Sequence, residues 1–241
     1  MARRTGKRVK ASQRGPAGDD LAGDLIRLHQ EKPEFTEAYL RKMIITNFGA
    51  GHETMASTLT SLMAMLGTHK GVHARLTDEV RQQQDLHDTP DQDQLPYLHA
   101  VIKESKRLHP VVAMSLPRTV PATGLDLDGY YFPAGTTVGC SPIALQRNEE
   151  ICGPDPSAFN PDRWQDEERA RDMDMYSLSW GGGARSCPGR HLAEMIVWNI
   201  CIALIAEFDI DVQVPTDDEM PTYFLSMMTG AKARFTPITR S

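Results

Sequence analysis

The sequence has few cysteines and no long apolar run, and these shortages exclude several classes of protein. Its 241 residues include four cysteines without the paired spacing of a disulfide framework, so we expect a reducing compartment. The longest apolar run, residues 195–206, contains Asn199 and is too short to cross a bilayer. The N-terminus lacks the apolar stretch of a signal peptide. As written, the chain predicts a cytoplasmic location without a membrane span.

Negative charge predominates outside the first residues. The formal net charge is −6, and residues 1–14 carry six Lys or Arg and no acid, which leaves −12 for the remainder. The basic start is either a solvated tail or a contact for nucleic acid or another acidic partner. The acidic body excludes nucleic-acid binding as the main function. The chain is 40% hydrophobic and long enough to bury a core as one domain or one large part of a domain.

Hydrophobic periodicity predicts a mainly helical fold. The expected helices are Leu21–Gln30, Glu37 to about Thr68 with Thr36 as N-cap, Val72 to about Gln84, Leu95–Leu108 and Leu192–Phe208. Short runs of β type, punctuated by Gly and Pro, occupy residues 111–140 and the last segment of the chain.

A glycine-rich stretch, Trp180–Gly189, precedes the last predicted helix. The glycines at 181–183 permit positive φ, so the loop can turn its amides towards the sulfur of Cys187. Pro188 suits the first position of a helix, which would place Cys187 near a helix N-terminus. Amides and helix dipole both stabilise an anion, so we expect Cys187 to be a thiolate. Arg185 is a fixed cation that could pair with a carboxylate of the group that the thiolate binds.

This stretch resembles the cysteine loop of the cytochrome P450 family, Phe-x-x-Gly-x-Arg-x-Cys-x-Gly. The matching residues are Gly183, Arg185, Cys187 and Gly189, with Trp180 where Phe is usual. The resemblance implies that the loop binds haem b (iron protoporphyrin IX), with Cys187 as the axial ligand of the iron. Two other interpretations of Cys187 remain: a buried small hydrophobic residue, or a zinc ligand with His191, although no second ligand pair has zinc spacing.

Two glycines, Gly49 and Gly51, lie inside the long predicted helix, where each costs about 1 kcal/mol relative to Ala. The segment resembles the distal helix of the family, because Ala50, Gly51, Glu53 and Thr54 match Ala/Gly-Gly-x-Asp/Glu-Thr. The resemblance implies that Ala50 and Gly51 leave room for O2, while Glu53 and Thr54 deliver protons. From the residues alone, Thr54 could instead bond back to its own helix and Glu53 could be solvated.

Glu104 and Arg107 lie three residues apart, a spacing that by itself predicts a surface pair worth a few tenths of a kcal/mol. They resemble the family's Glu-x-x-Arg motif, which implies a structural ion network with Arg163. That arginine stands in Pro161–Trp164, similar to the family's Pro-Glu-Arg-Phe, and the network would lock the fold beneath the haem. Arg118 matches the position that contacts a haem propionate in the family.

The resemblance runs from about Ala38 to Phe235. It implies a partial cytochrome P450 fold, mainly α-helical with a minor antiparallel β-sheet, that corresponds to the C-terminal haem-binding part. We expect residues 1–35 to be a basic, flexible lead-in with a short helix, and residues 36–241 to be the haem-binding part. The implied function is a haem-thiolate monooxygenase of secondary metabolism that hydroxylates an apolar small molecule. Its partners would be O2 and an electron donor such as an NADPH-dependent reductase. Family members are often anchored to the endoplasmic reticulum membrane by a preceding N-terminal segment.

Two other functions remain open. Family members are much longer than this chain, so it could be a truncated, catalytically inactive remnant that binds haem or a partner. A truncated gene product, a mis-predicted gene and one part of a split polypeptide would look alike in sequence. The second alternative is a haem-thiolate isomerase or a peroxide-using enzyme. Those enzymes often lose the distal acid and threonine, and both are present here as Glu53 and Thr54.

Overall fold

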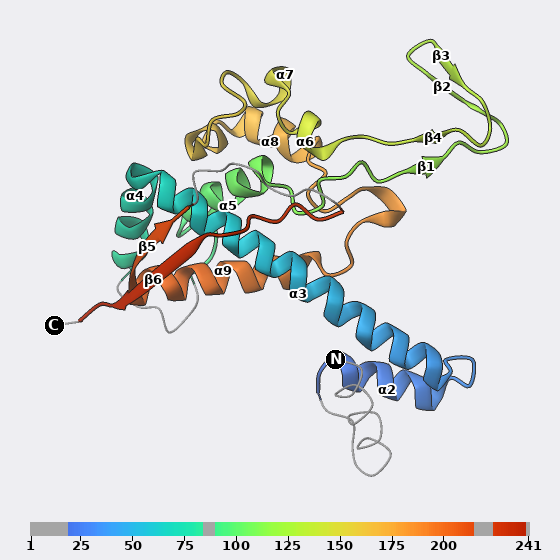
Figure 1. Ribbon diagram of the computed structural model, residues 1–241, viewed down its shortest axis with the longest axis horizontal. Coiled ribbons are helices and arrows are strands. Elements are labelled where there is room, and N and C mark those ends of the chain that lie inside the picture. Colours follow the sequence, from blue (N-terminus) through green and yellow to red (C-terminus); the bar gives the residue numbers. More distant parts are fainter. Residues whose placement is uncertain (1–18, 84–89, 215–223, 240–241) are drawn as a thin grey trace. The chain divides into compact units, whose positions relative to one another are not determined.

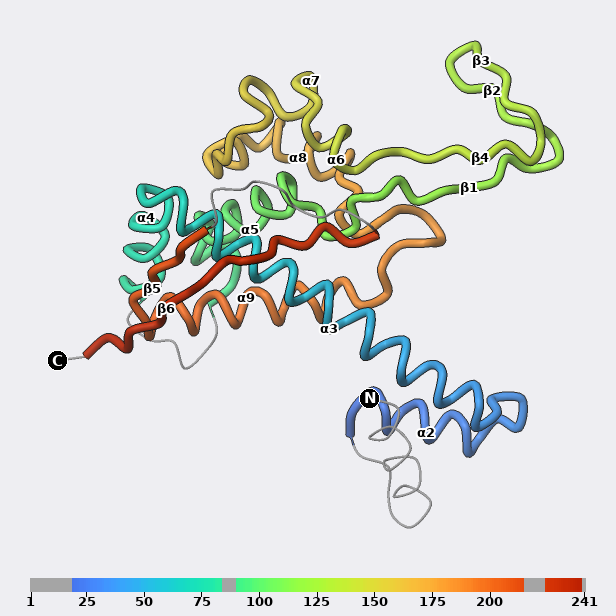
Figure 2. The backbone as a smooth tube through the Cα atoms, viewed as in Figure 1, coloured from blue at the N-terminus to red at the C-terminus, as the bar shows by residue number. Residues whose placement is uncertain are grey.

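The computed structural model describes residues 19–83, 90–214 and 224–239 (Figures 1 and 2). The helices there are α2 (Leu21–Glu31), α3 (Glu37–Thr68), α4 (Lys70–Arg81), α5 (Pro96–Leu108), α6 (Pro142–Leu145), α7 (Glu149–Cys152), α8 (Glu167–Met175) and α9 (Arg190–Glu207), with 3-10 turns η1 (Pro161–Trp164) and η2 (Gly183–Arg185). The strands are β1 (Arg118–Thr119), β2 (Leu125–Leu127), β3 (Tyr130–Phe132), β4 (Thr137–Val138), β5 (Phe208–Gln213) and β6 (Lys232–Pro237). The predicted fold class, helical with small antiparallel sheets, is confirmed.

All five predicted helices are present, and their ends agree with the predicted ones to within three residues. The second helix was expected over residues 72–84, but it begins at Lys70 and ends at Arg81. Three short helices between residues 142 and 175 were not predicted, because their segment shows no apolar periodicity. Residues 1–18 of the predicted flexible lead-in lie outside the described residues. Within the described part of the chain, no helix is long and apolar enough to span a membrane.

The chain divides into two compact units, Met1–Glu53 and Thr54–Ser241, at a point inside α3. The predicted division between a lead-in, residues 1–35, and a haem-binding part, residues 36–241, stays a prediction. It describes which residues bind haem, whereas the two units describe how the chain packs. In the first unit, Ile26 of α2 and Leu40 of α3 are buried in one small hydrophobic cluster. Leu25, Phe35 and Ile44 pack against this cluster. Thr36 is the predicted N-cap of α3: its hydroxyl accepts a hydrogen bond from the Tyr39 N–H at 3.3 Å.

In the second unit, α4 packs against α5 and α9, and the C-terminal part of α3 joins the same core. The side chains with almost no exposure there are Leu62, Leu66, Leu76, Val80, Leu95, Leu98, Val101, Cys201 and Ile205. Burying each such aliphatic side chain contributes roughly 1.5–3 kcal/mol, so these four helices form the stable frame of the unit.

Helix α4 also supplies polar groups to the ends of its two neighbours. The carboxylate of Glu79 accepts the N–H groups of Tyr97 and Leu98, both at 2.8 Å, at the start of α5. Two residues further along α4, the Arg81 guanidinium donates to the Ile205 carbonyl at 3.0 Å, in the last turn of α9. Helix ends leave such groups unsatisfied, and α4 therefore fixes where α5 begins and α9 ends.

Three two-stranded antiparallel sheets complete the unit: β1 with β4, β2 with β3, and β5 with β6. The β2–β3 hairpin turns at Asp128 and Gly129, whose φ angles of 51° and 77° are those of a tight hairpin turn. β5 follows α9 directly and pairs with β6 from Phe208↔Pro237 to Gln213↔Lys232. The segment after α5 pairs with the late part of the chain through a bridge between Val112 and Leu225.

Candidate functional site

The glycine-rich stretch forms a closed loop before α9. The N–H of Cys187 donates to the carbonyl of Trp180 at 2.8 Å, which ties the two ends of the loop together. Gly181 and Gly183 have φ angles of +71° and +59°, a region that L side chains rarely adopt. The Ser186 hydroxyl donates to the Gly183 carbonyl at 2.9 Å. The positive φ angles expected of this loop are present at Gly181 and Gly183, and they allow the chain to turn back so that Cys187 lies beside Trp180.

The loop does not enter the helix as predicted. Pro188 was expected at the first position of the helix, but α9 begins at Arg190, with Gly189 as its N-cap. Pro188 and Gly189 form a turn in which the Arg190 N–H donates to the Cys187 carbonyl at 3.4 Å. Cys187 thus lies three residues before the first residue of the helix. The thiolate state itself stays a prediction.

The side chain of Cys187 is exposed, which overturns its interpretation as a buried hydrophobic residue. Cys201 on α9 is the contrasting case, because burial raises the pKa of its thiol to about 12 and leaves it inert. Zinc is not supported either. Within residues 19–83, 90–214 and 224–239, no three His, Cys, Asp or Glu side chains cluster as a metal site requires, and this includes His191. Cys187 is therefore available as a single sulfur ligand.

The two predicted cofactor-contacting arginines are also accessible. Arg185 ends the turn η2 inside the loop and is exposed. Arg118, in β1, is exposed as well, and its guanidinium donates to the carbonyls of Leu116 and Pro117 at 3.2 and 3.0 Å. Both side chains are exposed, so each can reorient towards an anionic group at small cost.

The predicted distal residues lie within α3, at the division between the two units. Ala50, Gly51 and Glu53 end the first unit and are exposed, while Thr54 begins the second and is half-buried. A side chain added at Gly51 would meet nothing within 4 Å. The helix continues through Gly49 and Gly51 without a break, although each glycine lowers its intrinsic helix stability.

Glu104, Arg107 and Arg163 form a buried ion network, so Glu104 and Arg107 are not the surface pair that their spacing alone would predict. The Glu104 side chain is 0% exposed, and each arginine side chain is 3% exposed. Arg107 donates twice to the carboxylate, at 2.8 and 2.9 Å, and Arg163 donates once, at 2.9 Å. The backbone N–H of Asn160 and the indole N–H of Trp164 add further bonds, both at 2.9 Å.

The arginines use their remaining donors on backbone carbonyls. Arg107 bonds the carbonyls of Gln146 and Pro156, at 2.8 and 2.6 Å, and Arg163 bonds that of Cys152 at 2.7 Å. Burial by itself would raise the pKa of Glu104, but hydrogen bonds and charge from Arg107 outweigh it and lower that pKa. The network therefore fastens the irregular segment before the Cys187 loop onto α5.

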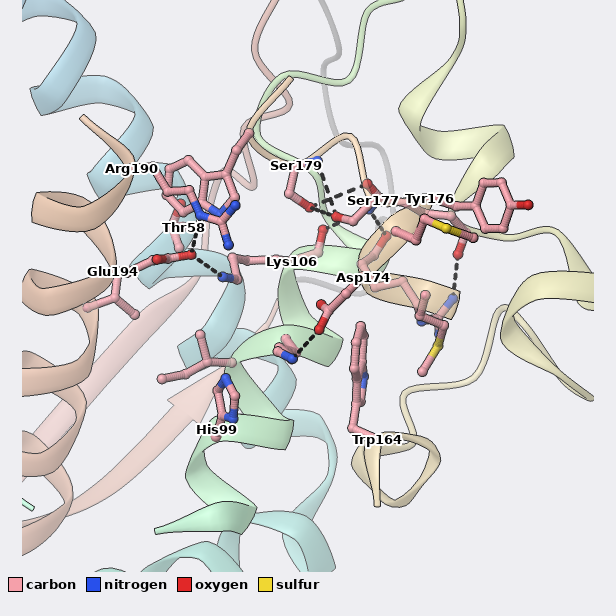
Figure 3. Close-up of a pocket in the computed structure, with 18 of the residues that line it drawn as sticks. Thr58, His99, Lys106, Trp164, Asp174, Tyr176, Ser177, Ser179, Arg190 and Glu194 are labelled. Carbon is pink, nitrogen blue, oxygen red and sulfur yellow. Dashed lines mark hydrogen bonds and ion pairs between the residues drawn. The ribbon is translucent and has the colours of Figure 1, made fainter. Parts of the chain in front are cut away.

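A cavity of about 640 Å³ lies in the second unit, between α3, α5, α9 and the segment that leads into the loop (Figure 3). Trp180 and Gly181 of the loop line it, whereas Cys187 does not. Its polar lining includes Lys106, Arg190 and Glu194, which point towards one another in the close-up. This cavity could not be predicted from the sequence, because its walls come from several segments that are far apart along the chain.

Comparison with known proteins decides the family. The model of the cytochrome P450 family matches residues 7–235, nearly the whole chain. The chain belongs to the cytochrome P450 family. Its relatives within the family include the cytochrome P450 monooxygenase sdnT of Sordaria araneosa, which is 52% identical over 91% of this chain. A pisatin demethylase of Fusarium vanettenii is 33% identical over 85% of it.

The fold is also that of this family. A cyanobacterial P450, CYP120A1 with bound retinoic acid, superposes with a TM-score of 0.85 over 99% of this chain, at 24% sequence identity. The chain covers 43% of the length of sdnT, 42% of the pisatin demethylase and 55% of the CYP120A1 chain. It thus spans less than half the length of sdnT and of the pisatin demethylase.

The chemistry of the loop suits the cofactor of the family. Cytochromes P450 hold their haem iron through one Cys thiolate. Cys187 provides a single accessible sulfur, and Arg118 and Arg185 provide accessible cations for the propionates of a haem. The residues present therefore fit a haem.

Proposed function

We propose that this chain is the haem b-binding part of a cytochrome P450 monooxygenase. The enzyme would hydroxylate an apolar small molecule, using O2 and electrons from a donor such as an NADPH-dependent reductase. The observation that carries the proposal is the exposed Cys187 in a closed glycine-rich loop directly before α9. The names of the relatives, a monooxygenase and a demethylase, support oxidation of a small organic molecule.

Cys187 is the residue that would ligate the iron. Its N–H is committed to the Trp180 carbonyl, which fixes the backbone from which the sulfur projects. Arg118 and Arg185 would pair with the propionates, as charge-assisted bonds between guanidinium and carboxylate. The haem supplies the activation of O2 and the redox chemistry when bound, and the protein contributes position and electrostatics.

The distal residues would handle protons and space. Glu53 and Thr54 are adjacent on α3, so a carboxylate and a hydroxyl can pass a proton through water towards the reaction centre. Ala50 and Gly51 would leave room for O2, because neither carries a side chain beyond Cβ. Replacing Thr54 by Ala would break this proton relay and leave the helix intact.

The ion network of Glu104, Arg107 and Arg163 has a structural role in this proposal. It holds the carbonyls of residues 146–158 on α5, and the chain then continues through residues 165–179 to Trp180. The network would therefore set the position of the loop without contacting the cofactor.

The test of the proposal compares two exposed cysteines. The Cys187→Ser variant is expected to lose the absorption spectrum of thiolate-ligated haem, because a hydroxyl is a poor ligand for haem iron. The Cys140→Ser variant is the matched control, since Cys140 is also exposed but lies outside the loop. Purified chains loaded with haem are measured as ferrous CO complexes. A thiolate-type spectrum in Cys187→Ser, or its loss in Cys140→Ser, would sink the assignment.

A further inference from the structure

The cavity beside the loop has more positive than negative charge on its walls. Besides Arg107, which serves Glu104, four cations line it against two acids: Lys103, Lys106, Arg171 and Arg190 against Asp174 and Glu194. Lys103 and Asp174 neutralise each other through an ion pair of 2.6 Å. The excess charge is therefore concentrated elsewhere in the cavity.

Lys106 and Arg190 share one acceptor, which leaves the lysine undercompensated. Both approach Oε1 of Glu194, Arg190 at 3.1 Å and Lys106 at 3.8 Å, and the lysine side chain is only 19% exposed (Figure 3). Burial lowers the pKa of Lys106, with the charge of Glu194 opposing that effect. A sequestered ammonium with a distant, shared counterion gains most from a further anion.

Flat aromatic surfaces stand beside these cations. The Lys106 ammonium lies 5.3 Å from the ring centre of Trp180, and the Lys103 ammonium lies 5.1 Å from that of Trp164. Trp198 and His99 line the same cavity, and burial lowers the pKa of His99 to about 4, so its imidazole is neutral at pH 7. A cavity of about 640 Å³ is in the range that holds small organic ligands.

We propose that this cavity binds a planar aromatic carboxylate. The carboxylate lies between Lys106 and Arg190, and the ring packs on the indole of Trp180. Such a ligand supplies the missing negative charge and covers the apolar ring face at the same time, which neither an inorganic anion nor a neutral aromatic molecule does. The site is separate from the Cys187 sulfur, and the proposal holds whether or not the chain carries a haem.

Calorimetric titration of the full chain with 2-naphthoate and with 2-naphthamide tests the charge requirement directly. The two probes share ring and size and differ in charge. The naphthoate is expected to bind about tenfold more tightly, the effect of one compensating ion pair in a partly buried site. Equal affinity of the two probes, or no heat from millimolar naphthoate, overturns the proposal. This comparison needs no variant, so it stands even where a substitution disturbs folding.

Two variants locate the site. Lys106→Met keeps the length of the side chain and removes the ammonium, and it is expected to weaken naphthoate binding about tenfold and to leave naphthamide binding unchanged. Lys70→Met is the matched control, because Lys70 is 63% exposed and pairs loosely with Asp211 away from the cavity. Circular dichroism checks that both variants fold. Unchanged naphthoate affinity in Lys106→Met, or an equal loss in Lys70→Met, contradicts the assignment.

Discussion

Two acidic groups of the second unit, the Glu104 carboxyl and the Cys187 thiol, are held in opposite ways. Glu104 is fully buried and accepts hydrogen bonds from Arg107, Arg163, Trp164 and the backbone. Cys187 is exposed and is positioned by its own backbone N–H, bonded to Trp180. The comparison indicates that buried hydrogen bonds and ion pairs hold the segment that leads to the loop, whereas the Cys187 thiol itself stays accessible to a ligand.

The largest effect on stability is expected when the buried carboxylate of Glu104 is replaced. Glu104→Gln removes the charge that balances two buried guanidinium groups, so we predict a loss of about 3–5 kcal/mol in the free energy of unfolding. Chemical denaturation measures it. The control is Asp211→Asn, which breaks an exposed pair with Lys70 at 3.6 Å and should cost less than about 1 kcal/mol. Equal losses in the two variants would mean that the network carries no special stability.

Acid should weaken the same network, and the sign follows from the lowered pKa of Glu104. A carboxyl whose pKa is lower in the folded state stabilises the fold above its ordinary pKa of 4.5. That contribution is lost as the pH falls below 4.5 and through the folded-state value. The stability gap between wild type and Glu104→Gln should therefore be constant near pH 7 and shrink in acid. Denaturation curves across this range check it, and a gap that widens in acid contradicts the account.

The smallest of these effects is expected in the glycine-rich loop that holds the exposed Cys187. Gly183→Ala puts a side chain on a residue with a φ angle of +59°, which costs about 1 kcal/mol, while Gly182→Ala meets an extended residue with φ of −153° and open space. We predict that hydrogen exchange of the Cys187 amide becomes about fivefold faster in Gly183→Ala and stays unchanged in Gly182→Ala. Identical exchange in the two variants would show that loop strain does not position the cysteine.

Much of the helical frame could be predicted from local signals. Thr36 marks the start of α3 and Pro96 that of α5, and both signals act within one helical turn. The turn formed by Pro188 and Gly189 could not be predicted, because a proline at a helix entrance is equally compatible with the first helical turn and with the turn before it. The start of α8 had a signal that was overlooked: Asp166 accepts the N–H groups of Glu168 and Arg169 at 3.1 Å.

The candidate site was predictable in part. The spacing of Glu104 and Arg107 showed that they share a helix face, but their burial depends on a segment more than fifty residues later. Asn160 and Trp164 bond Glu104 across 56 and 60 residues of sequence. Neither was singled out as a partner, although Trp164 stands directly after Arg163. The shared acceptor Glu194 arises in the same way, because it brings a residue of α9 to Lys106 of α5, far apart in the sequence, which no local pattern encodes.

The absorption spectrum of the reduced, CO-bound wild-type chain tests the central claim most directly. If the Cys187 loop holds haem iron through its thiolate, the Soret band of this complex will be strongly shifted to the red, as thiolate ligation requires. A chain that takes up no haem, or one whose Soret band stays at the unshifted position of a neutral ligand, would contradict the account.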